Sequence, residues 1–149
     1  MMRWYHYLAL GLLGLITTLV VAHFQSTPGY MDADYYFGGG VQLVNGNGFS
    51  EMILWNYLDD PQGLPHASHA YWMPFASMIA AIGMWITHTS DFASARLGFI
   101  LISILVSPLT ALLSYSISKR RDFALAAGCF AIFSGYYVPF MSTTDTFSI

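Results

Sequence analysis

The stretch WYHYLALGLLGLITTLVVAHF, residues 4–24, is a run of 21 residues without Asp, Glu, Lys or Arg. A helix of about 20 apolar residues crosses the roughly 30 Å hydrocarbon core of a bilayer. Arg3 directly precedes the run, and Trp4 and Tyr5 at its start favour the membrane–water interface. We therefore predict a transmembrane helix over Trp4–Phe24. A cleavable signal peptide ending at Ala22 is the alternative, but the apolar run is long for such a peptide.

The composition of the chain is typical of a membrane protein. Of its 149 residues, 56% are hydrophobic, 17% are aromatic and only 9% are charged, against about 25% charged residues in a soluble domain. The formal net charge is −3, and the chain has no basic stripe of the kind that binds nucleic acid. Cys129 is the single cysteine, which excludes an internal disulfide framework and a Cys-based metal site. We expect an all-α integral membrane protein with no nucleic-acid partner.

Two more segments are long enough to cross a bilayer. Residues 92–117 include Arg96 one turn in and Pro108, which predicts a kink. Residues 123–141 carry no charge. By contrast, PFASMIAAIGMWITH (74–88) has 15 residues and would reach only about 22 Å as a helix, at 1.5 Å per residue. We predict three transmembrane helices, over 4–24, 92–117 and 123–141, and a shorter helix over 74–88 that does not cross.

The basic residues set the expected orientation, because Lys and Arg accumulate on the cytoplasmic side of a membrane. With three crossings and a cytoplasmic N-terminus, Arg3 and the KRR cluster at 119–121 are inside, and only Arg96 is outside. A fourth crossing through 74–88 would export the KRR cluster. We therefore expect an extracytoplasmic loop over 25–91, in which residues 74–88 form an interfacial helix on the outer membrane surface.

The first part of this loop, residues 25–73, contains five acidic residues and no Lys or Arg. We predict a short helix over about 33–44, ended by the turn VNGNG. Asp32 at its start is either a functional acid or the N-cap of this helix. Asp34 follows two residues later, and Asp145 lies at the outer end of the third predicted span. We expect Asp145 beside Asp32 and Asp34, because acids at a bilayer interface are costly and are usually functional.

Several short motifs run in order along the chain. The first is DADYYFGGGVQLVNGNGF, with Asp32 in the lead and Tyr36 four positions on; YWMPFAS, SARLGFILIS with Arg96, and TTDTF with Asp145 follow. Their order and predicted topology resemble the start of the GT-C membrane glycosyltransferases, and most of all the protein O-mannosyltransferase and aminoarabinose transferase families. The likeness covers nearly the whole chain. In two places the chain departs from it: Ala33 follows Asp32 where these families have Glu, and SHAYWMP replaces a His-Pro-Pro or acid-Lys pair.

This resemblance implies a function and a site. The function is transfer of a sugar from a polyprenyl-phosphate donor, itself a membrane lipid, to an acceptor on the extracytoplasmic face of the bacterial inner membrane. Asp32 or Asp34 is the catalytic base that takes the acceptor's proton, and Arg96 pairs with the donor phosphate. The expected substrate-binding residues are Arg96, Asp145, His69 and Tyr36. A divalent metal ion held by Asp32 and Asp145 would offset the repulsion between these acids.

A non-catalytic membrane scaffold, or a subunit associated with a transporter, is the alternative function. In that case Asp32 is a helix cap, Arg96 only reaches for lipid headgroups, and His69 is a plain surface histidine. Three spans cannot enclose the substrate cavity that the resembled families build from many more helices. We therefore expect this chain to be the N-terminal part of a longer enzyme, whose sugar and acceptor the residues do not identify.

Overall fold

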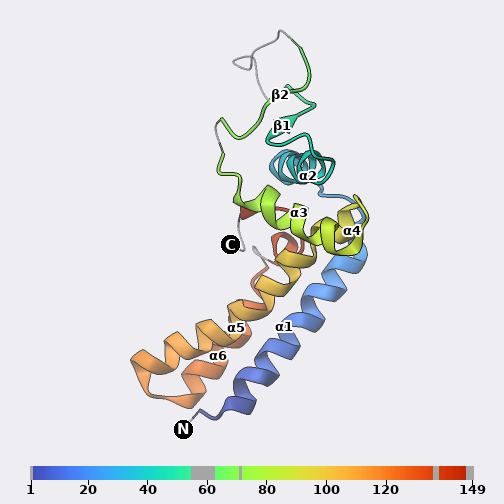
Figure 1. Cartoon of the computed structure of the whole chain (residues 1–149). Coiled ribbons are helices and arrows are strands. Elements are labelled where there is room, and N and C mark those ends of the chain that lie inside the picture. Colours follow the sequence, from blue (N-terminus) through green and yellow to red (C-terminus); the bar gives the residue numbers. More distant parts are fainter. Residues whose placement is uncertain (1, 55–62, 71, 136–137, 147–149) are drawn as a thin grey trace. The chain divides into compact units, whose positions relative to one another are not determined.

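The computed structural model describes residues 2–54, 63–70, 72–135 and 138–146, and most of them are helical (Figure 1). The elements, in chain order, are α1 (Trp4–Phe24), α2 (Met31–Val44), β1 (Ser50–Glu51), β2 (His66–Ala67), α3 (Phe75–Thr87), α4 (Phe92–Ala95), α5 (Leu97–Ser118), α6 (Arg121–Ile132) and the 3₁₀ turn η1 (Val138–Phe140). The chain divides into two compact units. Among the described residues, unit 1 holds 2–26 and 99–143, and unit 2 holds 27–98 and 144–146.

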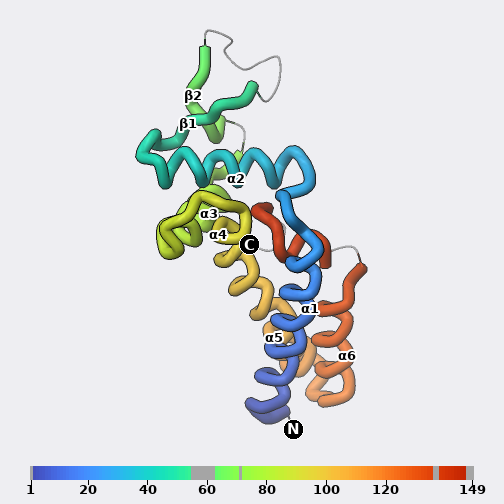
Figure 2. The backbone as a smooth tube through the Cα atoms, turned by 90° about the vertical axis from the view of Figure 1, so that its right-hand side faces the viewer, coloured from blue at the N-terminus to red at the C-terminus, as the bar shows by residue number. Residues whose placement is uncertain are grey.

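Unit 1 is built from α1, α6 and most of α5, which lie side by side (Figures 1 and 2). Small residues allow this close packing. A Cβ added to Gly128 of α6 would lie 2.7 Å from Leu10 Cδ1 of α1 and 3.2 Å from the Cβ of Ala111 in α5. Close approach of backbones through glycine is the usual way in which helices associate in membranes.

The start of α1 and the turn between α5 and α6 lie at the same end of unit 1. Met2 and Tyr7 pack with Tyr115 near the end of α5 and with Ala124 near the start of α6. Arg3 and the KRR cluster at 119–121 are therefore at one end of this unit, as Figure 1 also shows for the N-terminus and the α5–α6 turn.

The opposite end of α1 meets the segment that follows α6. The side-chain amide of Gln25 donates a hydrogen bond of 2.7 Å to the carbonyl of Pro139. Its carbonyl oxygen accepts a second hydrogen bond from the hydroxyl of Ser142. These two bonds hold residues 139–142 at the level where α1 ends.

Two helices of the described chain are long and apolar enough to cross a membrane. The first is α1, whose bounds Trp4–Phe24 confirm the sequence prediction. The second is the stretch Phe92–Ser118, formed by α4 and α5 with a break at Arg96. The helix α3 (Phe75–Thr87) has 13 residues and is shorter than a span, as its length in the sequence predicts.

The third predicted span differs from the structure. A continuous helix was expected over 123–141, but α6 ends at Ile132 and is followed by a turn and by η1. The sequence of this region explains the early end. Gly135 weakens a helix, and Pro139 lacks the N–H that an interior helical residue donates. The α6 helix of 12 residues extends for only about 18 Å, at 1.5 Å per residue.

Unit 2 places α3 between α2 and α4, with glycine at both contacts. A Cβ on Gly40 of α2 would lie 2.9 Å from the Cβ of Ala80 in α3. A Cβ on Gly83 of α3 would lie 2.2 Å from the carbonyl oxygen of Ser94 in α4. Any side chain at these positions would push the helices apart, so the glycines set the separation of the three helices.

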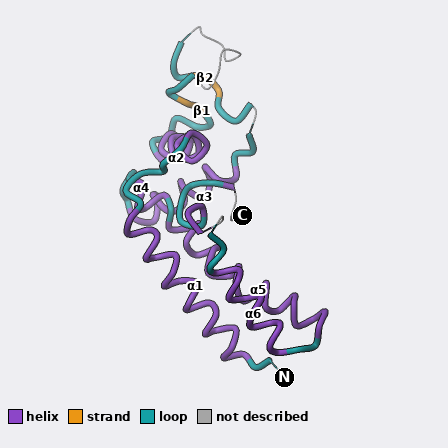
Figure 3. The backbone as a smooth tube through the Cα atoms, turned by 180° about the vertical axis from the view of Figure 1, so that it is seen from behind, coloured by secondary structure: helices purple, strands orange, loops and turns teal. Residues whose placement is uncertain are grey.

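The remaining part of unit 2 is a two-stranded antiparallel ladder, coloured orange in Figure 3, in which Glu51 pairs with His66. The helix α2 begins at Met31, two residues before the predicted start at residue 33. It ends in the predicted turn, where Gly46 adopts a left-handed φ of 80° and donates its N–H to the carbonyl of Leu43. This is the glycine position that commonly ends a helix.

Candidate functional site

The first turn of α2 carries Asp32 and Asp34. The N-cap of this helix is Tyr30, in an extended conformation, so the interpretation of Asp32 as the N-cap is wrong. Both acids instead lie inside the first turn, where a negative charge interacts favourably with the helix dipole. Asp32 is half-buried, whereas Asp34 is exposed. The two carboxylates therefore stand in different environments although they are only two residues apart.

The segment 144–146 belongs to unit 2 and lies against this first turn. The hydroxyl of Thr144 donates a hydrogen bond of 2.7 Å to the carbonyl of Ala33, the residue between the two acids. The side chain of Thr146 is hydrogen-bonded to the phenol of Tyr36, one turn further along α2. More than 100 residues of chain separate these partners, and the structure brings them into one neighbourhood.

Asp145 lies between these two threonines and is buried, with 1% of its surface exposed. One carboxylate oxygen accepts hydrogen bonds from the backbone N–H and the hydroxyl of Thr146. The other, Oδ2, is buried and has no hydrogen-bond partner among the described residues. Burial raises the pKa of the Asp145 carboxyl above its usual range, and the hydrogen bonds from Thr146 oppose this rise. A buried acceptor without a hydrogen bond costs about 1–3 kcal/mol. A ligand that donates a hydrogen bond to Oδ2 of Asp145 would remove this cost.

Tyr36 lies near both Thr146, the neighbour of Asp145, and the charge of Asp32. Its side chain is 2% exposed, and its hydroxyl meets Thr146, the neighbour of Asp145. Burial raises the pKa of the Tyr36 phenol, and the negative charge of Asp32 raises it further. The phenol therefore stays protonated at neutral pH, where it can donate a hydrogen bond but cannot act as a base.

A second polar cluster lies on the neighbouring side of α2, around His69. The imidazole Nε2 is 3.0 Å from the hydroxyl of Ser77, which in turn donates a hydrogen bond of 3.0 Å to the carbonyl of Tyr36. Nδ1 is 2.7 Å from the hydroxyl of Ser68. The backbone N–H of His69 donates to the phenol oxygen of Tyr35. Burial lowers the pKa of the His69 imidazole, which favours the neutral ring, able to donate at Nε2 and to accept at Nδ1.

Arg96 approaches α2 from another direction. Its guanidinium lies over the ring of Phe92, 5.0 Å from the centroid. Phe92 in turn meets the ring of Phe37 on α2, edge to face, with centroids 6.0 Å apart. The residue is half-buried at the break between α4 and α5, at the start of the second candidate span. The pairing of Arg96 with a donor phosphate stays a prediction.

Carboxylate and hydroxyl oxygens, which are ligands for Mg²⁺ and Ca²⁺, make up the group around Asp145. Among the described residues, however, no three His, Cys, Asp or Glu side chains come together as a metal-binding group. A divalent ion at Asp32 and Asp145 stays a prediction, and we derive the chemistry from the protein side chains alone.

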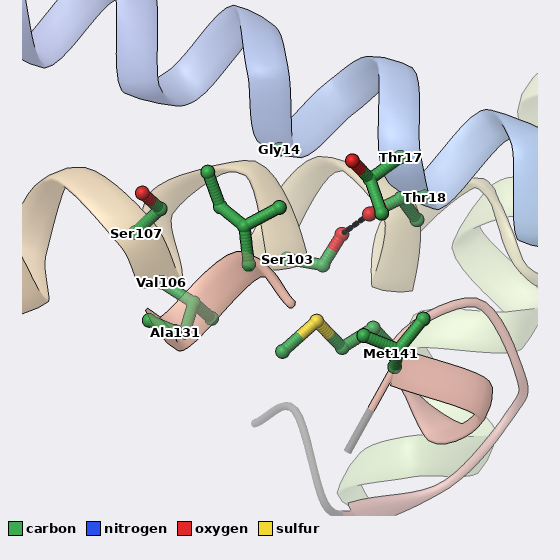
Figure 4. Close-up of a pocket in the computed structure, with 10 residues that line it drawn as sticks. Gly14, Thr17, Thr18, Ser103, Val106, Ser107, Ala131 and Met141 are labelled. Atoms are coloured by element: carbon green, nitrogen blue, oxygen red, sulfur yellow. Dashed lines mark hydrogen bonds between the residues drawn. The ribbon is translucent and has the colours of Figure 1, made fainter. Parts of the chain in front are cut away.

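Unit 1 has a separate small cavity between its helices (Figure 4). It has a volume of about 10 Å³, which is near the roughly 10–15 Å³ that a single water molecule needs. Thr18 and Ser103, whose hydroxyl oxygens are 3.2 Å apart, line one side. The cavity is lined by no titratable residue, so we place the candidate site in unit 2.

The sequence analysis did not identify several residues of the site. Thr144 and Thr146 are short polar residues in a segment where only the acid stood out. Ser77 lies in an apolar helix, and Tyr35 is one of several aromatic residues in its region of the sequence. Their roles depend on tertiary contacts over 30 or more residues of chain, which periodicity and local motifs do not report.

Comparisons with known proteins found no matching protein-family model, no similar curated protein and no similar solved structure.

Proposed function

We propose that the chain is an integral membrane protein with three crossings and a cytoplasmic N-terminus. The surface of α1 supports a lipid environment, because Leu12 and Ile16 are 51% and 58% exposed while Gly14 and Thr18 are buried. Large apolar side chains outside and small residues inside are typical of helices packed in a membrane. The third crossing includes α6.

The distribution of charge supports the same orientation. The four basic residues at Arg3 and 119–121 share one end of unit 1, and residues 139–142 are held at the other end by Gln25. A cytoplasmic location of the basic end follows the preference of Lys and Arg for that side.

Labelling of single cysteines tests this topology. Asn47→Cys and Lys119→Cys, each in a Cys129→Ala background, place thiols at two exposed positions. We expect an impermeant reagent to label Asn47→Cys from the outside and Lys119→Cys only after the membrane is opened. Labelling of both from the same side would contradict three crossings.

We further propose that the protein transfers a sugar from a polyprenyl-phosphate donor to an acceptor on the extracytoplasmic face. The observation that carries this proposal is the buried Asp145 carboxylate, one oxygen of which has no hydrogen-bond partner in the described part of the chain. Its neighbour Thr144 is bonded to the turn that bears Asp32. Buried polar groups without partners in the protein are rare and call for a physical explanation, and a polar ligand provides one.

The side chains of the site then have distinct tasks. Asp32, half-buried in the first turn of α2, takes the proton of the acceptor hydroxyl as its oxygen attacks the anomeric carbon. The bond from that carbon to the phosphate oxygen breaks, and the phosphate leaves with the polyprenyl chain. Arg96 stabilises the negative charge on this leaving group. Tyr36, which stays protonated, donates a hydrogen bond to the substrate, and Asp145 and His69 orient the sugar hydroxyls.

Two matched variants test this assignment. Asp32→Asn and Asp34→Asn each remove one charge from the same turn. We expect Asp32→Asn to reduce transfer from a polyprenyl-phosphate sugar by a factor of about 10² to 10⁴, with little change in unfolding temperature. The exposed Asp34 should tolerate the change. Wild-type activity in both variants would mean that these acids only stabilise the start of α2 through the helix dipole.

The non-catalytic alternative has one observation in its favour. Both acids lie in the first turn of α2, where they stabilise the helix by about 0.3–1 kcal/mol each without any chemistry. A scaffold would bind no donor, so titration of the purified protein with a polyprenyl-phosphate sugar separates the two functions.

A further inference from the structure

Three positive side chains at one end of unit 1 form no ion pair within the described part of the chain. They are Arg3, Lys119 and Arg121, and all three are exposed. The fourth cation of this end, Arg120, is paired, because its guanidinium donates hydrogen bonds to both carboxylate oxygens of Asp122. Asp122 is the only acidic residue in α1, α5 and α6. It offsets one cation and leaves the charge of the other three.

The turn that carries Lys119 is short and is held by hydrogen bonds. Only Lys119 and Arg120 separate α5 from α6. The backbone N–H of Lys119 donates to the carbonyl of Tyr115 at 3.0 Å, and that of Arg120 donates to the hydroxyl of Ser118 at 3.2 Å. Lys119 has a left-handed φ of 55°, which glycine adopts more easily than lysine. The chain therefore carries a positive charge at a position where the backbone favours glycine.

The N-terminal cation joins this turn through the packing of unit 1. Met2, which precedes Arg3, belongs to the same hydrophobic cluster as Tyr115 and Ala124. Figure 2 likewise shows the N-terminus and the start of α6 at the same end of the unit. The uncompensated charges of α1 and of the α5–α6 turn therefore form one basic end, which we define as Arg3, Lys119 and Arg121.

Exposed apolar side chains adjoin the basic end. Trp4 directly follows Arg3, Ile117 lies in the last turn of α5, and Phe123 lies in the first turn of α6; all three are more than half exposed. Tryptophan is enriched at the level of the lipid headgroups. A ligand at this end would meet positive charge on one side and apolar surface on the other.

We propose that the basic end binds the headgroup of an anionic phospholipid such as phosphatidylglycerol. The phosphate meets the cations, of which arginine can bind two phosphate oxygens at once. The acyl chains lie along the exposed apolar side chains of the helices, which a free phosphate ion would leave unused. Anionic lipids of the cytoplasmic leaflet attract basic residues beside membrane spans. The proposal rests on the membrane crossing of α1 and Phe92–Ser118 proposed above, and it is independent of sugar transfer.

Lipid-selective fluorescence quenching tests the proposal. Ile117→Cys and Phe24→Cys are made singly in a Cys129→Ala background and labelled with an uncharged fluorophore. Both positions are exposed, and Phe24 lies at the other end of α1, within a run that has no Lys or Arg. The protein is reconstituted in vesicles of phosphatidylcholine with a minor fraction of phosphatidylglycerol. A nitroxide quencher near the top of the acyl chain is carried by one lipid or by the other.

We expect phosphatidylglycerol to be preferred over phosphatidylcholine about fivefold at the Ile117 label, because each cation near a lipid surface contributes a factor of about five. The Phe24 label should show no preference. The triple variant Arg3→Gln, Lys119→Gly, Arg121→Gln should lose the preference.

Two further variants separate charge from structure. The double variant Arg120→Gln, Asp122→Asn removes the paired cation and its partner together, so the preference should stay. Lys119→Gly alone should weaken the preference and keep or raise the unfolding temperature, because glycine suits the left-handed φ. A lysine with a purely structural role would instead lose stability and leave the lipid preference unchanged.

The outcomes that overturn the proposal are distinguishable from a failure of the topology. Equal quenching by the two lipids at the Ile117 label would show that the basic end selects no headgroup, with the crossing intact. Absence of quenching at both labels would remove the crossing itself. A preference that survives in the triple variant would exclude these cations as its source. Loss of the preference in inorganic phosphate, but not in sodium chloride of equal ionic strength, would assign the site to free phosphate.

Discussion

Replacing Gly39 by alanine should separate α2 from α3 and disturb the cluster around His69. The added Cβ would lie 2.6 Å from the hydroxyl oxygen of Ser77 and 3.0 Å from Cε1 of His69. Overpacking of this kind costs about 1–3 kcal/mol. Alanine in place of glycine inside a helix stabilises the helix by about 1 kcal/mol, which offsets part of this cost. We expect a net loss in the free energy of unfolding of between near zero and about 2 kcal/mol.

Gly38 provides a matched control in the same helix. A Cβ at Gly38 meets no described atom within 4 Å, so Gly38→Ala should keep only the helical gain of about 1 kcal/mol. Subtracting one variant from the other removes the helix propensity. The difference between the two unfolding free energies should then be the cost of the contact between the added methyl group at residue 39 and its neighbours, about 1–3 kcal/mol.

Reversible unfolding in detergent micelles, followed by circular dichroism, measures both free energies. The cost of Gly39→Ala should shrink in a Ser77→Ala background, because the closest atom to the new methyl group is then gone. If Gly39→Ala proves as stable as Gly38→Ala, α2 and α3 are not in the close contact described.

Three further changes probe unit 2. Folding lowers the pKa of His69, so the unfolded chain binds the proton more readily and the free energy of unfolding should fall as pH drops below about 6.5. Unfolding measured at a series of pH values should show this dependence, and His69→Asn should lose it. Folding raises the pKa of Asp145, so the free energy of unfolding should fall as pH rises through that pKa. In Asp145→Asn the free energy of unfolding should depend less on pH above 3.8, the ordinary pKa of the carboxyl. Gly83→Ala puts a Cβ 2.2 Å from the backbone oxygen of Ser94, which cannot rotate away, and should cost about 3 kcal/mol or more in the same unfolding assay; a smaller cost than that of Gly39→Ala would contradict this packing.

The helices of this protein differ in how well the sequence predicts them. The bounds of α1 follow from an uninterrupted apolar run after Arg3, and those of α3 from a short apolar run between Pro74 and His88. Both signals are local. The early end of α6 was missed because residues 123–141 are uniformly apolar, and hydropathy does not distinguish a helix from the irregular segment that Gly135 and Pro139 produce.

The candidate site divides in the same way. Asp32 and Asp145 stand out because they lie just outside predicted spans in a chain with few charges, and the family resemblance singles them out as site residues. The hydrogen bond from Thr144 to Ala33 and the links of His69 to Ser77 and Tyr35 could not be predicted. These contacts depend on how the chain folds back on α2, and hydroxyl groups give no sign in the sequence of which partner they will meet.

Within the described residues, the chain passes between its two units after Ser26, after Gly98 and after Thr143. The last passage delivers only residues 144–146 to unit 2, and they include Asp145. During synthesis, α2 and α3 are therefore made long before the segment that completes them. The hydrogen bond from Thr144 to the Ala33 carbonyl can form only after α5 and α6 have been made, so the acidic site is completed by one of the last segments of the described chain.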